Sequence, residues 1–283
     1  MCKCQTGGMR MKKLSLILLL FYSLLTVHSV SAKTASRLKI EMLDWNEVDQ
    51  ILPKYTKFTV MDLETGKKFN VQRRAGSHHA DVQPLTAEDT KTMKEIYGGK
   101  WSWKRRAIIA IYKKQRIAAS MHGMPHGAGA LKNNFPGHFC IHFYGSTTHR
   151  TNKMDLSHML MIYKASGNLD KYLGQANPYE VIEAYIAGFK QQDSRIVSKA
   201  SLQSINWKPI LKKVDNARII RMEYLPPEDL KNEIYLEVPV EVDWNVINKG
   251  PMSYKGIIHL VRFSPAGSWK IDSDSFLDEN HFP

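Results

Sequence analysis

Cys140 and the histidines around it are the residues of this chain whose types and spacing could do chemistry. Cys140 lies in the segment GHFCIHF, with His138 and His142 two positions away on its two sides. A cysteine thiolate is a strong nucleophile and a metal ligand, and a neighbouring imidazolium stabilises it. The segment therefore points to thiol catalysis or to a metal site.

Five histidines fall between positions 122 and 149, and three interpretations of them compete. In the first, Cys140 is a nucleophile and a loop histidine is its base, since one well-placed imidazole can activate a thiol. In the second, Cys140 binds zinc with two histidines and leaves one position open for catalysis. The zinc ligands would come from His122, His126, His138 and His142. In the third, the histidines are structural, and this role is expected for His78, His79, His149 and His158.

The pattern from residue 138 to residue 143 predicts a β-strand, because apolar and polar side chains alternate along it. One face would pack on the core, and the other would present the thiol between two imidazoles. The core face holds Phe139, Ile141 and Phe143, and the other face holds His138, Cys140 and His142. We expect the imidazoles to lower the thiol pKa from its ordinary value of about 8.5.

Strand pairs and a loop precede this segment. Residues 58–63 and 68–71 indicate a hairpin, and residues 107–112 and 116–120 indicate a second strand pair. Residues 121–135 are rich in Gly, Pro and Asn, which predicts a loop. The loop would then cover the thiol-bearing face of the strand that follows it.

Helix signals occur at three places. Thr86 and Asp89 resemble a capping box, and Asp155 can begin a helix after the Cys140 segment. A domain boundary is expected at residues 167–176. Beyond it, Asn177 and Pro178 are typical of a helix cap and a first helical residue.

The last third of the chain alternates strongly in polarity. Residues 233–244 predict one long strand, and Pro239 places it at a sheet edge or turns that position toward solvent. With the helix before it, this pattern predicts an α+β domain over residues 177–283. The pattern resembles the nuclear-transport-factor-2-like (NTF2-like) fold.

Residues 1–32 are typical of a secretory signal peptide. Basic residues precede the apolar run Leu14–Val27, which is followed by small residues ending at Ala32. The run is shorter than the roughly 20 apolar residues of a membrane span, so we expect cleavage and no stable membrane span afterwards. An uncleaved anchor is the alternative. Cleavage would remove Cys2 and Cys4 and leave Cys140 with no partner for an internal disulfide.

The chain is basic, with 283 residues and a formal net charge of +13. The predicted signal peptide holds four of the 40 basic residues and none of the 27 acidic ones, so the chain after cleavage carries a formal net charge of +9. A basic exported protein suits an anionic surface such as a bacterial wall rich in phosphate polymers. No nucleic-acid-binding module is recognisable, so nucleic acid is not an expected partner.

The spacing of the histidines and Cys140 is similar to a family motif. Fourteen residues separate His122 from the run Gly137-His138-Phe139-Cys140-Ile141-His142. The L,D-transpeptidase (YkuD-like) motif runs His, fourteen to seventeen residues, Ser or Thr, His, Gly, Cys, a β-branched residue and Arg. The resemblance covers about residues 55–165, and the chain departs from the motif at the positions of Gly137, Phe139 and His142.

The resemblance implies a divergent, mainly β catalytic domain over residues 33–167, a YkuD-like β-sandwich with short helices. It implies acyl transfer on peptidoglycan stem peptides, in which Cys140 forms a thioester that an amine or water then cleaves. His122 or His126 would be the base, with the spacing favouring His122. His138 would position the thiol and, with the Cys140 backbone amide, polarise the oxyanion.

The remaining implications concern the substrate, the cofactor and the location. Gly123, Gly137 and His142 would contact the stem peptide, and no metal or organic cofactor is needed. The protein would be secreted and associated with a bacterial cell wall. Two alternatives stay open: a zinc-dependent wall peptidase or amidase that uses the histidines, and a non-catalytic wall-binding protein.

Overall fold

The computed structural model of the chain describes Met1 and residues 39–148, 153–226 and 230–280. Apart from Met1, the predicted signal peptide of residues 1–32 lies outside the described residues, and so does His149. Within the described ranges, no helix combines the length and the apolar character needed to cross a membrane.

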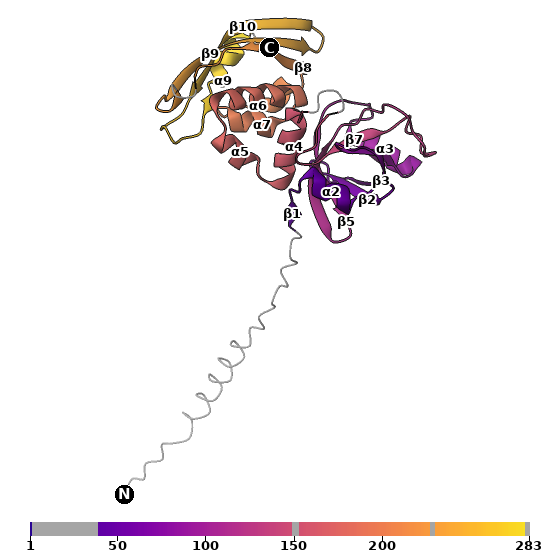
Figure 1. The fold of residues 1–283 in the computed structure, drawn as a ribbon. Coiled ribbons are helices and arrows are strands. Elements are labelled where there is room, and N and C mark those ends of the chain that lie inside the picture. The colour runs from indigo at the N-terminus through magenta and orange to yellow at the C-terminus, as the bar shows by residue number, and fades with distance from the viewer. Residues whose placement is uncertain (2–38, 149–152, 227–229, 281–283) are drawn as a thin grey trace. The chain divides into compact units, whose positions relative to one another are not determined.

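The first sheet closes on itself. Its strands are ordered β1-β6-β5-β2-β3-β4-β7, and β7 also pairs with β6, so six strands form a barrel. Figure 1 draws this part in indigo to magenta. The strands are β1 (Ile40–Glu41), β2 (Lys57–Asp62), β3 (Lys68–Ala75), β4 (Ala80–Pro84), β5 (Arg106–Tyr112), β6 (Gln115–Met121) and β7 (Phe139–His142), and the helices are α2 (Trp45–Ile51) and α3 (Ala87–Ile96).

β7 is the strand that closes the barrel. It is antiparallel to β4 on one side and to β6 on the other. We expected a β-sandwich for residues 33–167, and the double pairing of β7 gives a closed barrel in its place. Because both sides of β7 are paired, Cys140 lies within a continuous barrel wall and not on an exposed sheet edge.

The local signals of the β-rich part are confirmed. Gly66 has a φ of +68° in the turn between β2 and β3, which pair as predicted. Thr86 and Asp89 form a complete capping box at the start of α3. β5 and β6 also form an antiparallel pair, and residues 122–135 contain no helix.

Helices and a second sheet follow the barrel. Asp155 caps α4 (Leu156–Ser166), and Asn177 caps α6 (Pro178–Gln191), as predicted. The sheet is ordered β11-β10-β9-β8. The other elements are α5 (Leu169–Gln175), α7 (Ser194–Ala200), α8 (Trp207–Leu211), β8 (Val214–Met222), β9 (Tyr235–Val246), β10 (Gly250–Val261), β11 (Lys270–Ile271) and α9 (Ser273–Glu279). The content is α+β, and the NTF2-like resemblance stays a prediction.

The long alternating strand, β9, lies inside the sheet, so the edge alternative was wrong, and the exposed position of Pro239 confirms the alternative that it faces solvent. Pro239 is nevertheless tolerated. Its carbonyl accepts from the N–H of Glu223 at 3.1 Å, just after β8 ends at Met222. Because the N and O of one residue point to the same side of an antiparallel strand, the missing N–H of Pro239 faces the end of β8.

Three groups of buried apolar side chains hold the fold together. One fills the barrel and one lies between the second sheet and its helices. The third group, which we call the shared cluster, joins β5 and β6 to α4, α5, α6 and α7. Residues 38–283 accordingly form one compact unit. The predicted boundary at 167–176 therefore runs through a common core, although each sheet keeps a core of its own.

Leu160 tests the shared cluster, in which it is fully buried. We expect Leu160→Ala to lower the free energy of unfolding by about 2–5 kcal/mol. Calorimetry should show one transition at a lower temperature, because the cluster belongs to both parts. Leu202→Ala, where the side chain is 38% exposed, is the control and should change little. Two separate transitions, of which one alone moves, would mean that the parts unfold independently.

Candidate active site

Cys140 faces one imidazole and one carboxylate. Its Sγ lies 3.4 Å from Nε2 of His126 and 3.6 Å from Oδ1 of Asp81. Asp81 belongs to β4 and is the partner of Cys140 in the β4–β7 register. Phe139 and Ile141 pack in the barrel core, as their alternation predicted. Cys140 is 5% exposed as a residue, and its sulfur borders polar side chains.

The loop before β7 brings His126 to the thiol. The backbones of His126 and His138 form an isolated bridge, in which each N–H donates to the other carbonyl at 2.9 Å. Gly137 makes this approach feasible, because its φ is +126° and a Cβ there would lie 2.5 Å from the His126 carbonyl oxygen. Its N–H donates to Phe135, and its carbonyl accepts from Gln83. Packing therefore accounts for this glycine, and its contact with substrate stays a prediction.

Gly123 is also a packing position. A Cβ there would lie 2.5 Å from the ring of Tyr97. The Gly123 N–H donates to the carbonyl of Ser102 at 2.8 Å. The close approach of Tyr97 explains the need for glycine, and the predicted substrate contact of Gly123 is untested.

The tautomer of His126 suits a base. Its Nδ1 lies 3.2 Å from the carbonyl oxygen of Met124. Because a carbonyl can only accept, Nδ1 carries the proton and Nε2 presents its lone pair to the Cys140 thiol. One backbone carbonyl thus fixes the orientation of this ring.

His122, the base that the spacing favoured, is less well placed. Its Nδ1 accepts from the backbone N–H of Met124 at 3.4 Å, which leaves the proton on Nε2. Burial, followed by the charge of Arg105, holds the pKa of His122 well below its ordinary value. The geometry therefore favours His126 as the base.

Further imidazoles surround the pair. The rings of His79, His142 and His158 stack, with centroids 4.4 Å and 3.8 Å apart along the series. His158 also contacts the Ser120 hydroxyl at 2.9 Å. Within the described ranges, these rings belong to a group that we call the histidine cluster: His79, His122, His126, His138, His142 and His158.

The histidine cluster changes how three residues are interpreted. His79 and His158 were expected to be structural, and the structure places them beside the site residues. His142 was expected to contact substrate, and it is instead 4% exposed between two other imidazoles. It forms part of the wall of the site, so its direct contact with substrate stays a prediction.

Asp81 is the site residue that the sequence analysis missed. Its Oδ1 lies 3.2 Å from Nε2 of His79 and 3.9 Å from Nε2 of His138. The residue is 7% exposed, and buried carboxylates are rare unless they have a partner. The one signal in the sequence is an acidic residue between Ala80 and Val82 in a strand of buried residues.

Our expectation of a depressed thiol pKa was wrong. Burial, together with the negative charge of Asp81 and its hydrogen bond from the thiol, raises the pKa of Cys140. The pKa values of His122 and His158 are held well below normal, above all by burial, so these rings supply no positive charge at neutral pH. A protonated thiol that donates to Asp81 therefore lies beside the Nε2 lone pair of His126, and its proton would have to turn from Asp81 to His126 before the sulfur could act as a nucleophile.

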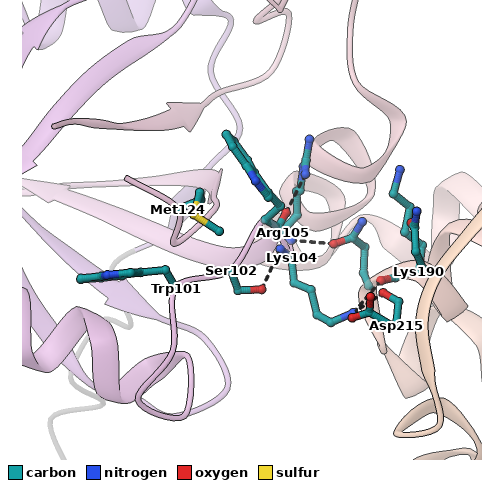
Figure 2. A pocket seen from close by; sticks show the side chains of 10 residues that line it. Trp101, Ser102, Lys104, Arg105, Met124, Lys190 and Asp215 are labelled. Atoms are coloured by element: carbon teal, nitrogen blue, oxygen red, sulfur yellow. Dashed lines mark hydrogen bonds between the residues drawn. The ribbon is translucent and has the colours of Figure 1, made fainter. Parts of the chain in front are cut away.

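The site borders a cleft of about 450 Å³. Trp103, which is half exposed, stands at the border: its ring centroid lies 4.7 Å from that of His122 and 5.5 Å from that of His126. Figure 2 shows the lining side chains, including Lys104 and Lys190. No pattern in the sequence points to these residues, because the cleft lies between segments far apart in the chain.

The same residues could also hold a metal ion. The ligand atoms of His79, Cys140 and His142 lie within 4.8 Å of one another, and so do those of His122, His126 and Cys140. In a tetrahedral zinc site, neighbouring ligand atoms are roughly 3.5 Å apart. Small side-chain movements would therefore complete a three-ligand site.

Comparisons with known protein families, with curated proteins and with solved structures find no match to this chain. The assignment of a function thus depends on the residues and their geometry.

Asp81 provides a test of the thiol environment. Since the thiol pKa is raised, the rate of Cys140 alkylation by iodoacetamide should still be rising at pH 9 in the parent protein. Asp81→Asn removes a negative charge beside the sulfur and should shift the rate profile to lower pH. Asp278→Asn, which removes an exposed carboxylate, is the control. An inflection below about 8.5 in the parent would contradict the raised pKa.

Proposed function

We propose that the protein is an exported cysteine-dependent acyltransferase that acts on peptidoglycan stem peptides, of the L,D-transpeptidase or L,D-carboxypeptidase type. The observation that carries the proposal is the contact of Cys140 Sγ with Nε2 of His126, whose Nδ1 proton is held by the Met124 carbonyl. A nucleophile, a base and a group that orients the base are the parts that thiol acyl transfer needs.

The reaction begins with the neutral pair. As Sγ attacks the peptide carbonyl carbon, the thiol proton passes to Nε2 of His126. The imidazolium then protonates the leaving amine, the C–N bond breaks, and a thioester remains on Cys140. In the second half, His126 takes a proton from an acceptor amine or from water, which attacks the thioester carbonyl carbon. The C–S bond then breaks, and the imidazolium of His126 returns its proton to the sulfur and restores the thiol. An amine gives transfer, and water gives hydrolysis.

Packing explains two departures from the family motif. Phe139 replaces a glycine, and its ring lies in the barrel core beside Phe69 and Phe135. His142 replaces an arginine and stacks in the histidine cluster. Both side chains point away from open space, so neither blocks the thiol. A wall location, with stem peptides and anionic polymers as partners, is part of the proposal and is supported by the basic charge.

A zinc-dependent peptidase or amidase is the second candidate. It is favoured by the two sets of histidine and cysteine ligand atoms that meet at Cys140. The thiol would then be a metal ligand, and a water in the open position would be the nucleophile. The two functions share residues and differ in whether the sulfur becomes acylated.

Acylation by a carbapenem tests the first candidate, because carbapenems acylate the cysteine of L,D-transpeptidases by family analogy. We expect intact-protein mass spectrometry to show one adduct on the parent protein and none on Cys140→Ala. His126→Ala should acylate at least roughly 100-fold more slowly, since a positioned base contributes about that much.

His122→Ala is the matched control, because it removes the same side chain from the same cluster. It should retain most of the acylation rate. If both histidine variants slowed acylation equally, His126 would not be the specific base. If the parent protein gained no adduct, the acyltransferase proposal would fail, and a non-catalytic wall-binding role would be favoured.

Metal removal separates the two candidates. We expect dialysis against a chelator to leave the rate of carbapenem acylation unchanged, because no step of the proposed reaction uses a metal. Metal analysis before and after dialysis is the accompanying measurement. Stoichiometric zinc in the parent and not in Cys140→Ala, with hydrolysis of wall peptides lost on chelation, would favour the zinc enzyme instead.

A further inference from the structure

The cleft beside the histidine cluster is built from both parts of the chain. Residues 101–105 and Met124 come from the barrel part, and Lys190 and Asp215 come from α6 and β8. Met124 belongs to the cleft wall and also holds His126 through its carbonyl. A ligand in the cleft would therefore lie next to the base of the proposed reaction.

Most polar groups of the cleft are already used to hold its walls together. The Lys104 ammonium donates to the carbonyls of Lys190 and Asp215 at 3.1 Å and 3.0 Å. The Gln191 side chain accepts from the Arg105 backbone N–H at 2.6 Å and donates to the Ser157 hydroxyl at 3.0 Å. Figure 2 shows the bonds made by Lys104 as dashed lines. These two side chains shape the cleft and are not free to bind a ligand.

Lys190 differs from them. Its side chain is half-buried, and across residues 39–148, 153–226 and 230–280 its ammonium makes no hydrogen bond or ion pair. Burial, followed by the positive charge of Arg105, lowers the pKa of Lys190. An anion would relieve both effects, because it would replace lost hydration and offset the neighbouring charge.

The other lining groups limit which anion fits. Asp215 is an exposed carboxylate in the same cleft, and it would repel a doubly charged phosphate more than a singly charged carboxylate. Trp101 and Trp103 add flat apolar surfaces that suit a peptide chain with small side chains. One free ammonium in a cleft that two indoles also line is thus better matched to a peptide carboxylate than to a polyphosphate.

We propose that this cleft binds the carboxylate-bearing end of a peptide substrate and that Lys190, supplied by the C-terminal part of the chain, binds the carboxylate. The proposal rests on the proposed function for the identity of the peptide. It assigns to the C-terminal part a direct role in substrate recognition.

The experiment measures peptide binding to Cys140→Ala protein, in which no acyl transfer can follow. The probe is N-acetyl-L-lysyl-D-alanine, compared with its C-terminal amide by calorimetry. We expect the amide to bind roughly tenfold more weakly than the acid, which is about what a hydrogen bond to a charged group contributes. Lys190→Met in the same background should lose the same factor, and Lys190→Arg should retain most of the binding.

Lys255→Met is the control, because it removes an exposed lysine that does not line the cleft. Equal binding of acid and amide, or equal losses in Lys190→Met and Lys255→Met, would overturn the proposal. Lys190-dependent binding of glycerol phosphate without binding of the peptide would also overturn it and would assign the cleft to a wall polymer. Lys190-dependent peptide binding would support the assignment of the cleft as a carboxylate site even if Cys140 proved unreactive toward carbapenem. The lack of reaction with carbapenem would defeat the acyltransferase proposal alone.

Discussion

The double pairing of β7 is the constraint on which the candidate site depends. Pairing with β4 sets Cys140 opposite Asp81, and pairing with β6 sets His142 opposite Ser120. The Ser120 hydroxyl in turn contacts His158 on α4. One short strand thus fixes the depth and the neighbours of the thiol, and the bridge between His126 and His138 adds His126 from the loop that leads into that strand.

Ion pairs connect the barrel that holds the site to the helices that follow it. Arg106 lies 2.7 Å from Asp62 and 3.2 Å from Glu64, and Lys164 on α4 lies 2.8 Å from Glu64 and also pairs with Asp193. Burial alone would raise the pKa of Asp62, but its hydrogen bonds and attraction to Arg106 lower it overall. The stabilisation by Asp62 is therefore present above its unfolded pKa and is lost as the pH falls through the folded value. These contacts hold α4, which carries His158, against the barrel wall.

The sequence predicted what short-range chemistry determines. The capping residues Thr86 and Asn177 begin their helices as expected, and the alternation around Cys140 assigns the two faces of β7 correctly. It could not predict what depends on residues far apart in the chain. Asp81 lies 59 positions before Cys140, and burial of the thiol together with the charge of Asp81 reverses the expected direction of the thiol pKa. The preference for His126 over His122 as the candidate base likewise depends on which ring nitrogen of His126 faces the Met124 carbonyl. The spacing of residues in the sequence cannot predict this orientation.

The burial of Cys140 also has a consequence for the chemical lifetime of the protein. Peroxides oxidise thiolates to sulfenic acids, and they attack exposed, low-pKa cysteines first. A sulfur that is 5% exposed and stays protonated beside Asp81 is a poor target for such oxidants. In the proposed reaction this sulfur would become a nucleophile only as it attacks a bound acyl group and its proton passes to Nε2 of His126. The environment that makes the resting thiol unreactive would thus also preserve the side chain in the reduced form outside the cytosol, where the proposed function places the protein.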